Sequence, residues 1–458
     1  MSIATTNPAT GEVAETYSEL APSALEAKVA LSAKTFATYR RTSFEQRAQW
    51  LLRCADLLEQ DAAELAAMAT LEMGKTLASA RAEVMKCAVG ARYYATHARE
   101  FLANEMLDAS AVGASQAYTR WEPLGPILAV MPWNYPFWQV LRFAAPAVMA
   151  GNVGLLKHAS NVPRCAMALE DVFARAGFPE GVFQTLLIGI DQVETLLCDP
   201  RVAAVTLTGS EAAGRSVGAI AGRSIKKSVL ELGGNDALIV MPSADLHRAA
   251  AVGATSRCQN NGQSCIAAKR FILHADIAEE FTELLVSRMA ALVVGDPMDA
   301  KTEVGPLATA RGRKEVDEQV RAAVQEGATV LLGGQPGAGP GWFYPPTVLS
   351  DLTPTMKIHQ QEVFGPVAQL FTVADLDAAI ALANSSDLGL SSSVWTRDPA
   401  ERAQLVAEID AGAVFVNGMS ASYPELPFGG IKNSGHGREL AAMGIKEFCN
   451  AKTVWVHP

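Results

Sequence analysis

The sequence has little of what marks several large classes of protein. Only 19% of its 458 residues are charged, and acidic residues outnumber basic ones by 48 to 38, for a net charge of −10. Nucleic-acid binding needs a clustered basic surface, so this balance argues against a nucleic-acid partner. No run of about 20 uninterrupted apolar residues is present, and we therefore expect no membrane span.

Cysteine pairs and targeting signals are also missing. The seven cysteines are odd in number, widely spread and never arranged as Cys-x-x-Cys. This pattern indicates neither a disulfide framework nor a zinc cluster, and we predict no bound metal. The first residues, MSIATTNPATGEV, resemble neither a secretory signal nor an Arg-rich transit segment. We therefore expect the protein in the cytoplasm.

The apolar residues are distributed as in an α/β protein with more than one domain. Helical spacing dominates residues 20–105, and short apolar runs separated by helical stretches follow Pro126. Alternation of this kind predicts parallel sheets covered by helices on both faces. The predicted strands are 127–131, 153–157, 183–189, 202–209, 270–275 and 413–418, and the later predicted helices are 245–260, 276–294 and 310–326.

Cys265 lies in a context that favours chemistry over packing. It ends QNNGQSC, a polar segment between a predicted helix and a predicted strand. A thiol attacks an aldehyde better than a hydroxyl does, because its thiolate is accessible near neutral pH. The resulting thiohemiacetal can lose hydride and leave a thioester. The alternative is a small buried apolar residue, as we expect for most of the other cysteines.

Hydrolysis of such a thioester needs a base that activates water. Glu231 stands in VLELGGN, where an apolar strand ends and two glycines allow close approach of backbones. A carboxylate at the end of a buried strand is costly unless it is used or paired. Glu231 is therefore either this base or one partner of a surface salt bridge.

Asn134 lies between strand 127–131 and a helix that we predict to open with Pro136. Its amide is either a helix cap or, with the backbone N–H of Cys265, a donor to the oxyanion of the thiohemiacetal.

Trp138 and Arg142 follow Asn134 at intervals of four, so in one helix all three project from nearly the same face. Arg142 on an otherwise apolar helix needs a carboxylate. Either a substrate supplies it, bound bidentately, or an Asp or Glu of the second domain forms a structural ion pair.

No Gly-x-Gly-x-x-Gly fingerprint is present. Instead, TLTGSEAAG runs from a predicted strand into a helix, which would place the N–H groups of Gly209 and Ser210 against a pyrophosphate. Lys157, at the end of strand 153–157, either reaches ribose hydroxyls or a phosphate or is an ordinary surface lysine.

Together these segments resemble the aldehyde dehydrogenase family over essentially the whole chain. The motifs occur in the family's order: PWN, the lysine of GLLK, TGS, ELGG, GQSC, EVFGP and PFGG. Seven ordered motifs make chance agreement negligible. The resemblance implies an α/β fold with a Rossmann-like cofactor domain, an α/β catalytic domain and a small β oligomerisation domain.

With that fold in view, we divide the chain into three parts. Residues 1–113 and 126–230 are expected to form the dinucleotide-binding domain, and residues 231–430 the catalytic domain. Residues 114–125 and 445–458 are expected to form an oligomerisation hairpin and tail, because both have strand character and sheet edges are usually covered.

The resemblance also implies roles for single residues. Cys265 is expected to be the nucleophile, Glu231 the general base and Asn134 the oxyanion amide. Glu362 is expected to hold the nicotinamide ribose, and Phe364 to pack beside the nicotinamide. The rest of the dinucleotide would be lined by Trp133, Lys157, Gly209 and Ser210.

Three longer segments, NNGQSCIAAKRFI, PWNYPFWQVLRFAAP and NGMSASYPELPFGG, are similar to the short bacterial NADP-dependent succinate-semialdehyde dehydrogenases. In that group, residues matching Arg142 and Ser420 hold the far carboxylate of succinic semialdehyde. Trp138 is expected to line the same cleft.

One departure from the family pattern concerns the cofactor. The usual KPSE reads KHAS here, so Ser160 replaces a glutamate that would bind the adenine-ribose hydroxyls and repel a 2′-phosphate. We therefore expect NADP to be preferred, with Ser160 and Lys157 near its phosphate and NAD as a weaker acceptor.

The sequence thus predicts oxidation of succinic semialdehyde to succinate by a homodimer or homotetramer. The alternatives are a dehydrogenase for neutral aliphatic or aromatic aldehydes, one for glutarate semialdehyde, and a noncatalytic dinucleotide-binding protein. Cys258, seven residues before Cys265, is either a packing residue without a redox role or forms a reversible disulfide.

Overall fold

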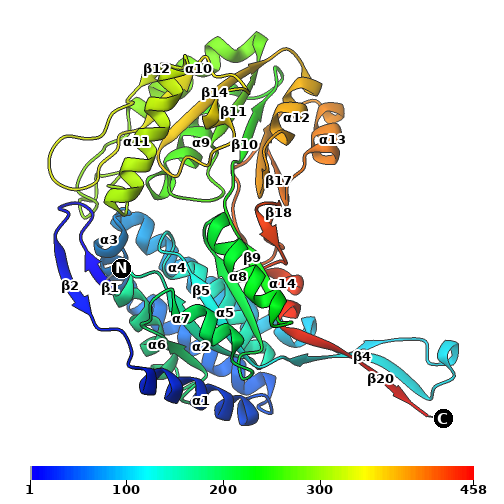
Figure 1. Cartoon of the computed structure of the whole chain (residues 1–458). Coiled ribbons are helices and arrows are strands. Elements are labelled where there is room, and N and C mark those ends of the chain that lie inside the picture. The colour runs from blue at the N-terminus through cyan, green and yellow to red at the C-terminus, as the bar shows by residue number, and fades with distance from the viewer. Residues whose placement is uncertain (1–2, 458) are drawn as a thin grey trace.

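The computed structural model describes residues 3–457, which form two lobes and a projecting arm (Figure 1). The chain crosses from the first lobe to the second after residue 231 and returns after residue 416. No helix within the described range is long and apolar enough to cross a bilayer.

The first lobe is built on a six-stranded sheet in the order β19-β9-β8-β5-β6-β7, in which every strand is parallel to its neighbours except the edge strand β19. In chain order, its strands are β5 Pro126–Met131, β6 Val153–His158, β7 Phe183–Thr185, β8 Ala204–Thr208, β9 Lys227–Glu231 and β19 Gly435–His436. Its helices are α1 Pro22–Tyr39, α2 Phe44–Gln60, α3 Ala62–Met73, α4 Leu77–Phe101, α5 Trp138–Ala150, α6 Pro163–Arg175, α7 Gln192–Cys198, α8 Glu211–Arg223 and α14 Ala441–Glu447.

Helix α5 lies at the centre of the first lobe. Every one of its residues is buried, which explains why it is apolar around nearly its whole circumference. Gln139 and Arg142 are the polar exceptions. A charged residue in such a helix must meet a partner or a polar cavity.

The second lobe holds a seven-stranded sheet in the order β12-β13-β14-β11-β10-β16-β17. Neighbouring strands of this sheet are parallel to each other, except that β12 and β13 are antiparallel. In chain order, its strands are β10 Ala237–Val240, β11 Arg270–His274, β12 Thr329–Leu332, β13 Thr347–Ser350, β14 Val367–Val373, β16 Ser391–Trp395 and β17 Ala413–Val416. Its helices are α9 Leu246–Cys258, α10 Ala278–Ala290, α11 Ala310–Gln325, α12 Leu376–Asn384 and α13 Pro399–Glu408. A two-stranded sheet pairs β15 Leu388–Gly389 with β18 Ile431–Lys432.

The arm is a separate three-stranded antiparallel sheet. Strand β20 (Cys449–Val456) pairs with β4 (Gln116–Pro123) over its full length, and β3 (Glu105–Met106) adds a short third strand. Two pieces of chain that had no place in either main sheet therefore pair with each other. Figure 1 shows that they project away from both lobes.

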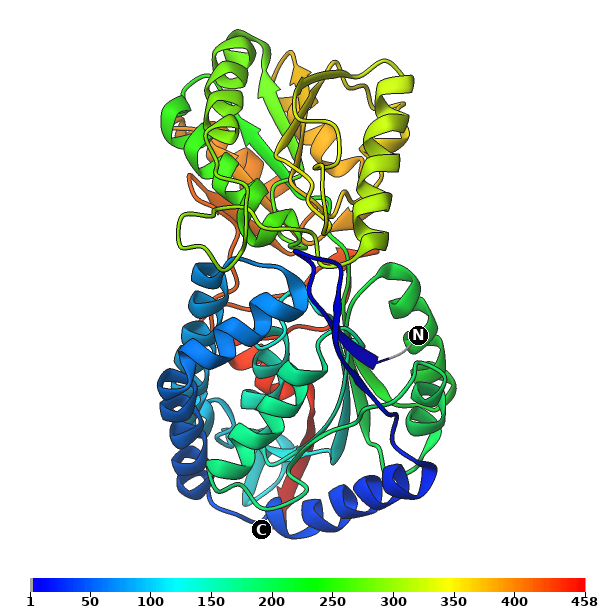
Figure 2. The same cartoon turned by 90° about the vertical axis from the view of Figure 1, so that its left-hand side faces the viewer.

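A pair of N-terminal strands, β1 (Ile3–Thr6) and β2 (Val13–Tyr17), was not predicted from the sequence. Figure 2 shows it running over the first lobe to the junction with the second. There the N–H of Trp342 donates to the carbonyl of Pro8 at 2.9 Å. The turn of this pair thus connects the two lobes.

Several predicted elements are shorter in the structure by one to four residues at an end, and two of these differences concern the site region. The strand expected at 183–189 ends at Thr185. The helix expected to open with Pro136 begins at Trp138, so Asn134 lies in the preceding turn and not on the helix. The expectation that Asn134, Trp138 and Arg142 share one helical face is therefore wrong for Asn134.

Candidate active site

The loop that carries Cys265 has an unusual backbone. Asn260, Asn261 and Gly262 have φ values of 54°, 58° and 77°, three consecutive residues in the left-handed region. Asparagine and glycine tolerate this region better than other residues. The local sequence NNG therefore allows the chain to turn sharply between the end of α9 and Cys265.

Tertiary contacts hold this turn in place. The Asn261 amide donates to the carbonyls of Gly74 and Pro306, both at 2.8 Å, and its oxygen accepts from the N–H of Gly305 at 2.8 Å. A Cβ at Gly262 would lie 2.3 Å from the backbone of Gly365, so only glycine fits there. The loop is thus tied to both lobes.

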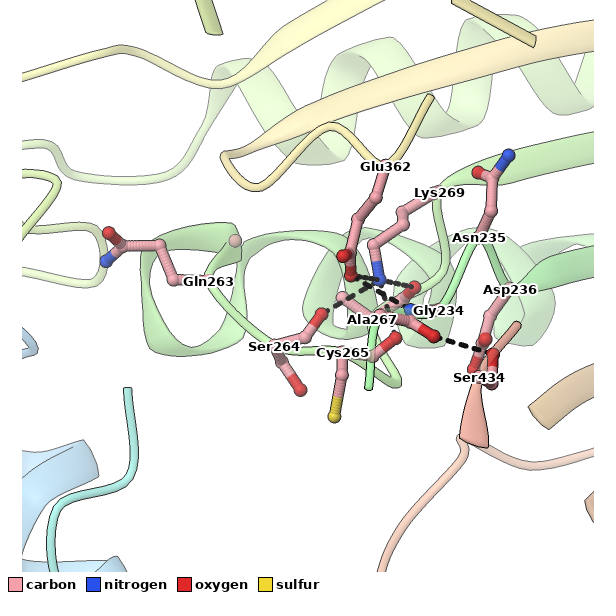
Figure 3. Close-up of polar contacts among 12 residues, drawn as sticks. Gly234, Asn235, Asp236, Gln263, Ser264, Cys265, Ala267, Lys269, Glu362 and Ser434 are labelled. Atoms are coloured by element: carbon pink, nitrogen blue, oxygen red, sulfur yellow. Dashed lines mark hydrogen bonds and ion pairs between the residues drawn. The ribbon is translucent and has the colours of Figure 1, made fainter. Parts of the chain in front are cut away.

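A buried lysine fixes the backbone of Cys265 itself. Lys269 Nζ donates to the carbonyls of Ser264 and Cys265 at 2.9 and 2.6 Å, and it lies 3.3 Å from Glu362 Oε1. Figure 3 shows the Cys265 sulfur pointing away from this cluster. The carbonyl side of the residue is therefore anchored, while the thiol points away from these contacts.

The electrostatic surroundings of the thiol are mixed. Burial raises the pKa of the Cys265 thiol to about 12, whereas Lys269 and Arg142 act in the opposite direction. In this state the thiol is mostly protonated at neutral pH. Its activation thus requires a base or a further positive charge close to the sulfur.

Cys265 opens onto a cavity of about 250 Å³. Four residues singled out from the sequence line it: Cys265 itself, Trp138 and Arg142 from α5, and Ser420 from the segment that returns to the first lobe. The cavity therefore brings the proposed nucleophile and the proposed substrate-binding side chains together.

Arg142 already has a carboxylate partner. Its side chain is 2% exposed and forms an ion pair with Glu439, and its guanidinium lies 4.6 Å from the centre of the Phe428 ring. Glu439 belongs to the C-terminal segment beyond the predicted catalytic domain. Arg142 thus both lines the cavity and takes part in a buried ion pair.

Asn134 lies beside the Cys265 loop but does not line the cavity. Its Nδ2 donates to the carbonyl of Gln263 at 3.1 Å, and its backbone carbonyl accepts from Asn260 at 2.8 Å. One amide hydrogen remains available for another acceptor.

The turn that carries Asn134 is held by His158, a residue that sequence reasoning missed. Its ring lies 2.9 Å from the carbonyl of Pro136 and accepts from the N–H of Ala159, also at 2.9 Å. Burial lowers the pKa of His158 to about 4, so it is neutral and can make both contacts.

Glu231 also lies outside the cavity wall. It is 2% exposed, and neither carboxylate oxygen has a hydrogen-bond partner within residues 3–457. Burial and the nearby Glu439 raise the pKa of Glu231 well above its ordinary value. This shift favours the protonated carboxyl group in this conformation, and the side chain must turn to reach the cavity.

Residues expected to contact the nicotinamide end of a dinucleotide come from both lobes. Trp133 and Phe364 meet edge to face, with ring centres 5.8 Å apart. Glu362 accepts from the N–H of Gly234 at 3.1 Å. These side chains border the Cys265 loop, because Lys269 contacts both Glu362 and Cys265.

Residues expected near the other end of the dinucleotide lie at the carboxyl edge of the first sheet. Ser210 caps α8 by accepting from Ala213 N–H, and a Cβ at Gly209 would meet nothing nearer than 3.6 Å. Among the described residues, Lys157 Nζ donates a hydrogen bond to the adjacent carbonyl of His158 alone, at 3.1 Å, and Ser160 is half-buried. An anion has room and N–H donors at the start of α8.

The match to known proteins extends over nearly the full chain. The model of the "Aldehyde dehydrogenase family" matches residues 1–454. The chain belongs to the aldehyde dehydrogenase family. The family and the α/β fold expected from the ordered motifs are thus confirmed.

Similar proteins share a narrower name. The chain is 61% identical to "Succinate-semialdehyde dehydrogenase [NADP(+)] 1" of Mycobacterium ulcerans and 60% identical to the protein of that name in Mycobacterium bovis, with 100% of each chain covered in both comparisons. The crystal structure of succinic semialdehyde dehydrogenase from Streptococcus pyogenes in complex with NADP+ is 37% identical, with a TM-score of 0.96 and 99% of each chain covered.

Sequence reasoning missed several side chains of this aldehyde dehydrogenase site. Glu439 was overlooked because its partner Arg142 is distant in the sequence, and Lys269 was overlooked although two of its acceptors lie within five residues of it. Lys269 had one signal, since a lysine in the apolar run CIAAKRFIL must be buried with acceptors. Lys86, which also lines the cavity, had none.

Proposed function

We propose that this aldehyde dehydrogenase oxidises succinic semialdehyde to succinate, with NADP preferred and NAD as a weaker acceptor. The observation that carries the proposal is a small cavity that holds both the Cys265 thiol and a wall with the guanidinium of Arg142. Relatives at 60–61% identity carry the name of this activity. An aldehyde with a second, anionic end matches such a cavity.

The chemistry begins at Cys265. Its thiolate attacks the aldehyde carbon, and the new oxyanion is stabilised by the Cys265 N–H and by the free amide hydrogen of Asn134. The dinucleotide, when bound, supplies the acceptor for the hydride that leaves the thiohemiacetal. A thioester on Cys265 remains.

Hydrolysis of the thioester is assigned to Glu231. The side chain must rotate out of its buried position near Glu439 and lose its proton before it can accept one from water. Gly429 makes room for the buried position, because a Cβ there would lie 2.8 Å from Glu231 Oε1. Glu231 then returns the active site to its thiol form by activating the water that releases succinate.

The residues of the cofactor region fit a dinucleotide. Trp133, Phe364 and Glu362 are the proposed contacts of the nicotinamide riboside, and Gly209 and Ser210 at the start of α8 those of the pyrophosphate; the Trp133–Phe364 ring contact and the free helix start support this. At the adenosine end, Ser160 provides a hydroxyl in place of a carboxylate. Lys157 provides an ammonium, and no carboxylate within residues 3–457 lies at ion-pair distance from it. This combination favours a 2′-phosphate.

The alternative substrates differ in charge and length. Neutral aliphatic or aromatic aldehydes would bring no negative charge to the cationic wall of the cavity. Glutarate semialdehyde has one methylene more than succinic semialdehyde, which is worth only about 1–3 kcal/mol in a pocket. We propose it as a secondary substrate.

We also propose a cytoplasmic homodimer or homotetramer. Trp455 and Val456 at the end of β20 are 49% and 40% exposed, and β20 is an edge strand of the arm. An exposed apolar edge favours pairing with another subunit.

The test is the steady-state formation of reduced cofactor, with succinic semialdehyde and uncharged butanal compared under NADP and NAD in turn. A large preference for the semialdehyde with NADP is expected. Equal or better rates with butanal would overturn the substrate, and equal rates with the two cofactors would overturn the role of Ser160.

A further inference from the structure

The cavity beside Cys265 is lined by two cationic side chains, Lys86 from α4 and Arg142 from α5. Glu83 is the one carboxylate that lines it among the described residues. Its oxygens are already engaged, one with Lys75 and the other with the N–H groups of Phe137 and Trp138. The wall therefore carries excess positive charge.

The charge of Arg142 is largely balanced within the protein. Its ion pair with Glu439 is fully buried, and Thr208 Oγ1 lies 3.4 Å from its Nη2. A substrate carboxylate at Arg142 would have to share the guanidinium with Glu439. A second positive group is needed to select for an anionic substrate strongly.

Lys86 is a cation whose charge is not balanced in this way. No carboxylate within residues 3–457 lies at ion-pair distance from its Nζ, which instead donates to Ser422 Oγ at 2.8 Å. The ammonium also lies 4.5 Å from the centre of the Trp138 ring. These contacts fix the position of the ammonium without neutralising it.

Ser422 is arranged to donate a hydrogen bond of its own. Its oxygen accepts from Lys86 Nζ and, at 2.9 Å, from Trp138 Nε1. Both lone pairs are thus used, and the hydroxyl hydrogen is left to donate. Ser422 lines the same cavity as Cys265.

We infer that the Lys86 ammonium and the Ser422 hydroxyl together bind the distal carboxylate of the semialdehyde and so determine the preference for an acidic aldehyde. This inference rests on the proposed function and adds two specificity-determining residues to it. Lys86 supplies the charge-assisted hydrogen bond, and Ser422 supplies a neutral donor beside it.

The first test compares Lys86→Met, Lys86→Arg and the native enzyme with saturating NADP. Loss of a hydrogen bond to a charged group should lower kcat/KM for succinic semialdehyde by about 10- to 100-fold in Lys86→Met. The change for butanal should stay within about threefold, since an uncharged chain makes no such bond. Lys86→Arg should restore much of the loss, because it keeps the charge.

A matched control is available outside the site. Lys446 Nζ also lies 4.5 Å from the centre of a tryptophan ring, that of Trp121, on the side of the arm. Lys446→Met should leave both kcat/KM values unchanged. Inhibition by succinate adds a measurement that needs no turnover, and its inhibition constant should rise in Lys86→Met by the same factor.

The pH profile provides an independent test. Burial, with help from Arg142, lowers the pKa of Lys86 to about 8. Glu83 and Cys87 on the same helix act in the opposite direction, and Tyr135 and Cys265 line the cavity opposite it. In the native enzyme, kcat/KM for the semialdehyde should therefore fall above pH 8 relative to that for butanal, whereas Lys86→Arg should not show this relative fall.

The outcomes separate this inference from the proposed function. If the native enzyme shows no preference for succinic semialdehyde over butanal, the proposed function fails. If the native enzyme has the preference and Lys86→Met retains it, the inference is wrong and the remaining cavity groups suffice. Equal losses for both aldehydes in Lys86→Met would also overturn it, because they indicate a structural role.

Discussion

The ion pair between Lys75 and Glu83 is the most deeply buried charge pair within the described chain, with side chains 0% and 1% exposed. Glu83 Oε1 accepts from the N–H groups of Phe137 and Trp138 at 2.8 and 2.9 Å, at the start of α5. Its other oxygen faces Lys75. The pair therefore holds the N-terminus of α5, the helix that carries Trp138 and Arg142. The variant Glu83→Gln tests how much this pair contributes to stability.

The expected cost follows from this geometry. In Glu83→Gln, the amide oxygen can still accept from the two backbone N–H groups, but the amide nitrogen replaces the oxygen that faces the ammonium. Lys75 then keeps only the Tyr135 ring, 4.0 Å away, as a partner. Breaking a buried ion pair on one side costs about 3–5 kcal/mol, a large part of the ~5–15 kcal/mol by which proteins are stable.

The assay is urea unfolding of the native protein, Glu83→Gln, Lys75→Met and the double variant. Because Lys75→Met removes the unpaired ammonium, the double variant should recover most of the stability lost in Glu83→Gln, giving a coupling energy of at least about 2 kcal/mol. Activity should also be lower in Glu83→Gln than in the double variant. Strictly additive losses in the double variant would refute the pairing argument.

Three further predictions concern catalysis and the cofactor. Cys265→Ala should abolish turnover and leave dinucleotide binding, measured by fluorescence titration, intact; surviving turnover would remove Cys265 from its role. Ser160→Glu should lower kcat/KM for NADP by at least about fivefold, since like charges ~4 Å apart repel by about 1 kcal/mol even in water. A smaller change would place the 2′-phosphate elsewhere. Because the pKa of Glu231 is raised, the steady rate after the burst of reduced cofactor should increase with pH as its carboxyl group loses its proton, and the increase should be absent in Glu231→Gln. Parallel profiles in the two proteins would contradict that assignment.

Three strands of the first sheet were predictable because they are buried on both faces. β5, β6 and β8 differ from their predicted ranges by no more than two residues at either end. Parallel strands in this position read as uninterrupted apolar runs. The β1–β2 pair has no such signal, since every residue of β2 is at least partly exposed and its sequence is VAETY. Its position depends on contacts with both lobes.

The site was predictable where chemistry is concentrated in a short segment. The sequence QNNGQSC contains both the proposed nucleophile and the residues that allow the left-handed turn before it. The conformation of Glu231 was not predictable, because it depends on Glu439, which lies more than 200 residues away. The partner of Arg142 was hidden for the same reason.

The balance of charge around α5 explains why a nearly apolar helix can border a site for an anion. The cation at its start, Lys75, is paired with Glu83, and the cation within it, Arg142, is paired with Glu439. Each pair stabilises the lobe, and neither leaves a full charge for a ligand. Lys86, on α4, is held by an aromatic face and a hydroxyl rather than by a carboxylate. A polar cavity tolerates such a cation only at the cost of a lowered pKa, and an anionic substrate removes that cost when it binds. The positive charge available to the substrate therefore comes chiefly from Lys86, while Arg142 is tied to the protein's own Glu439.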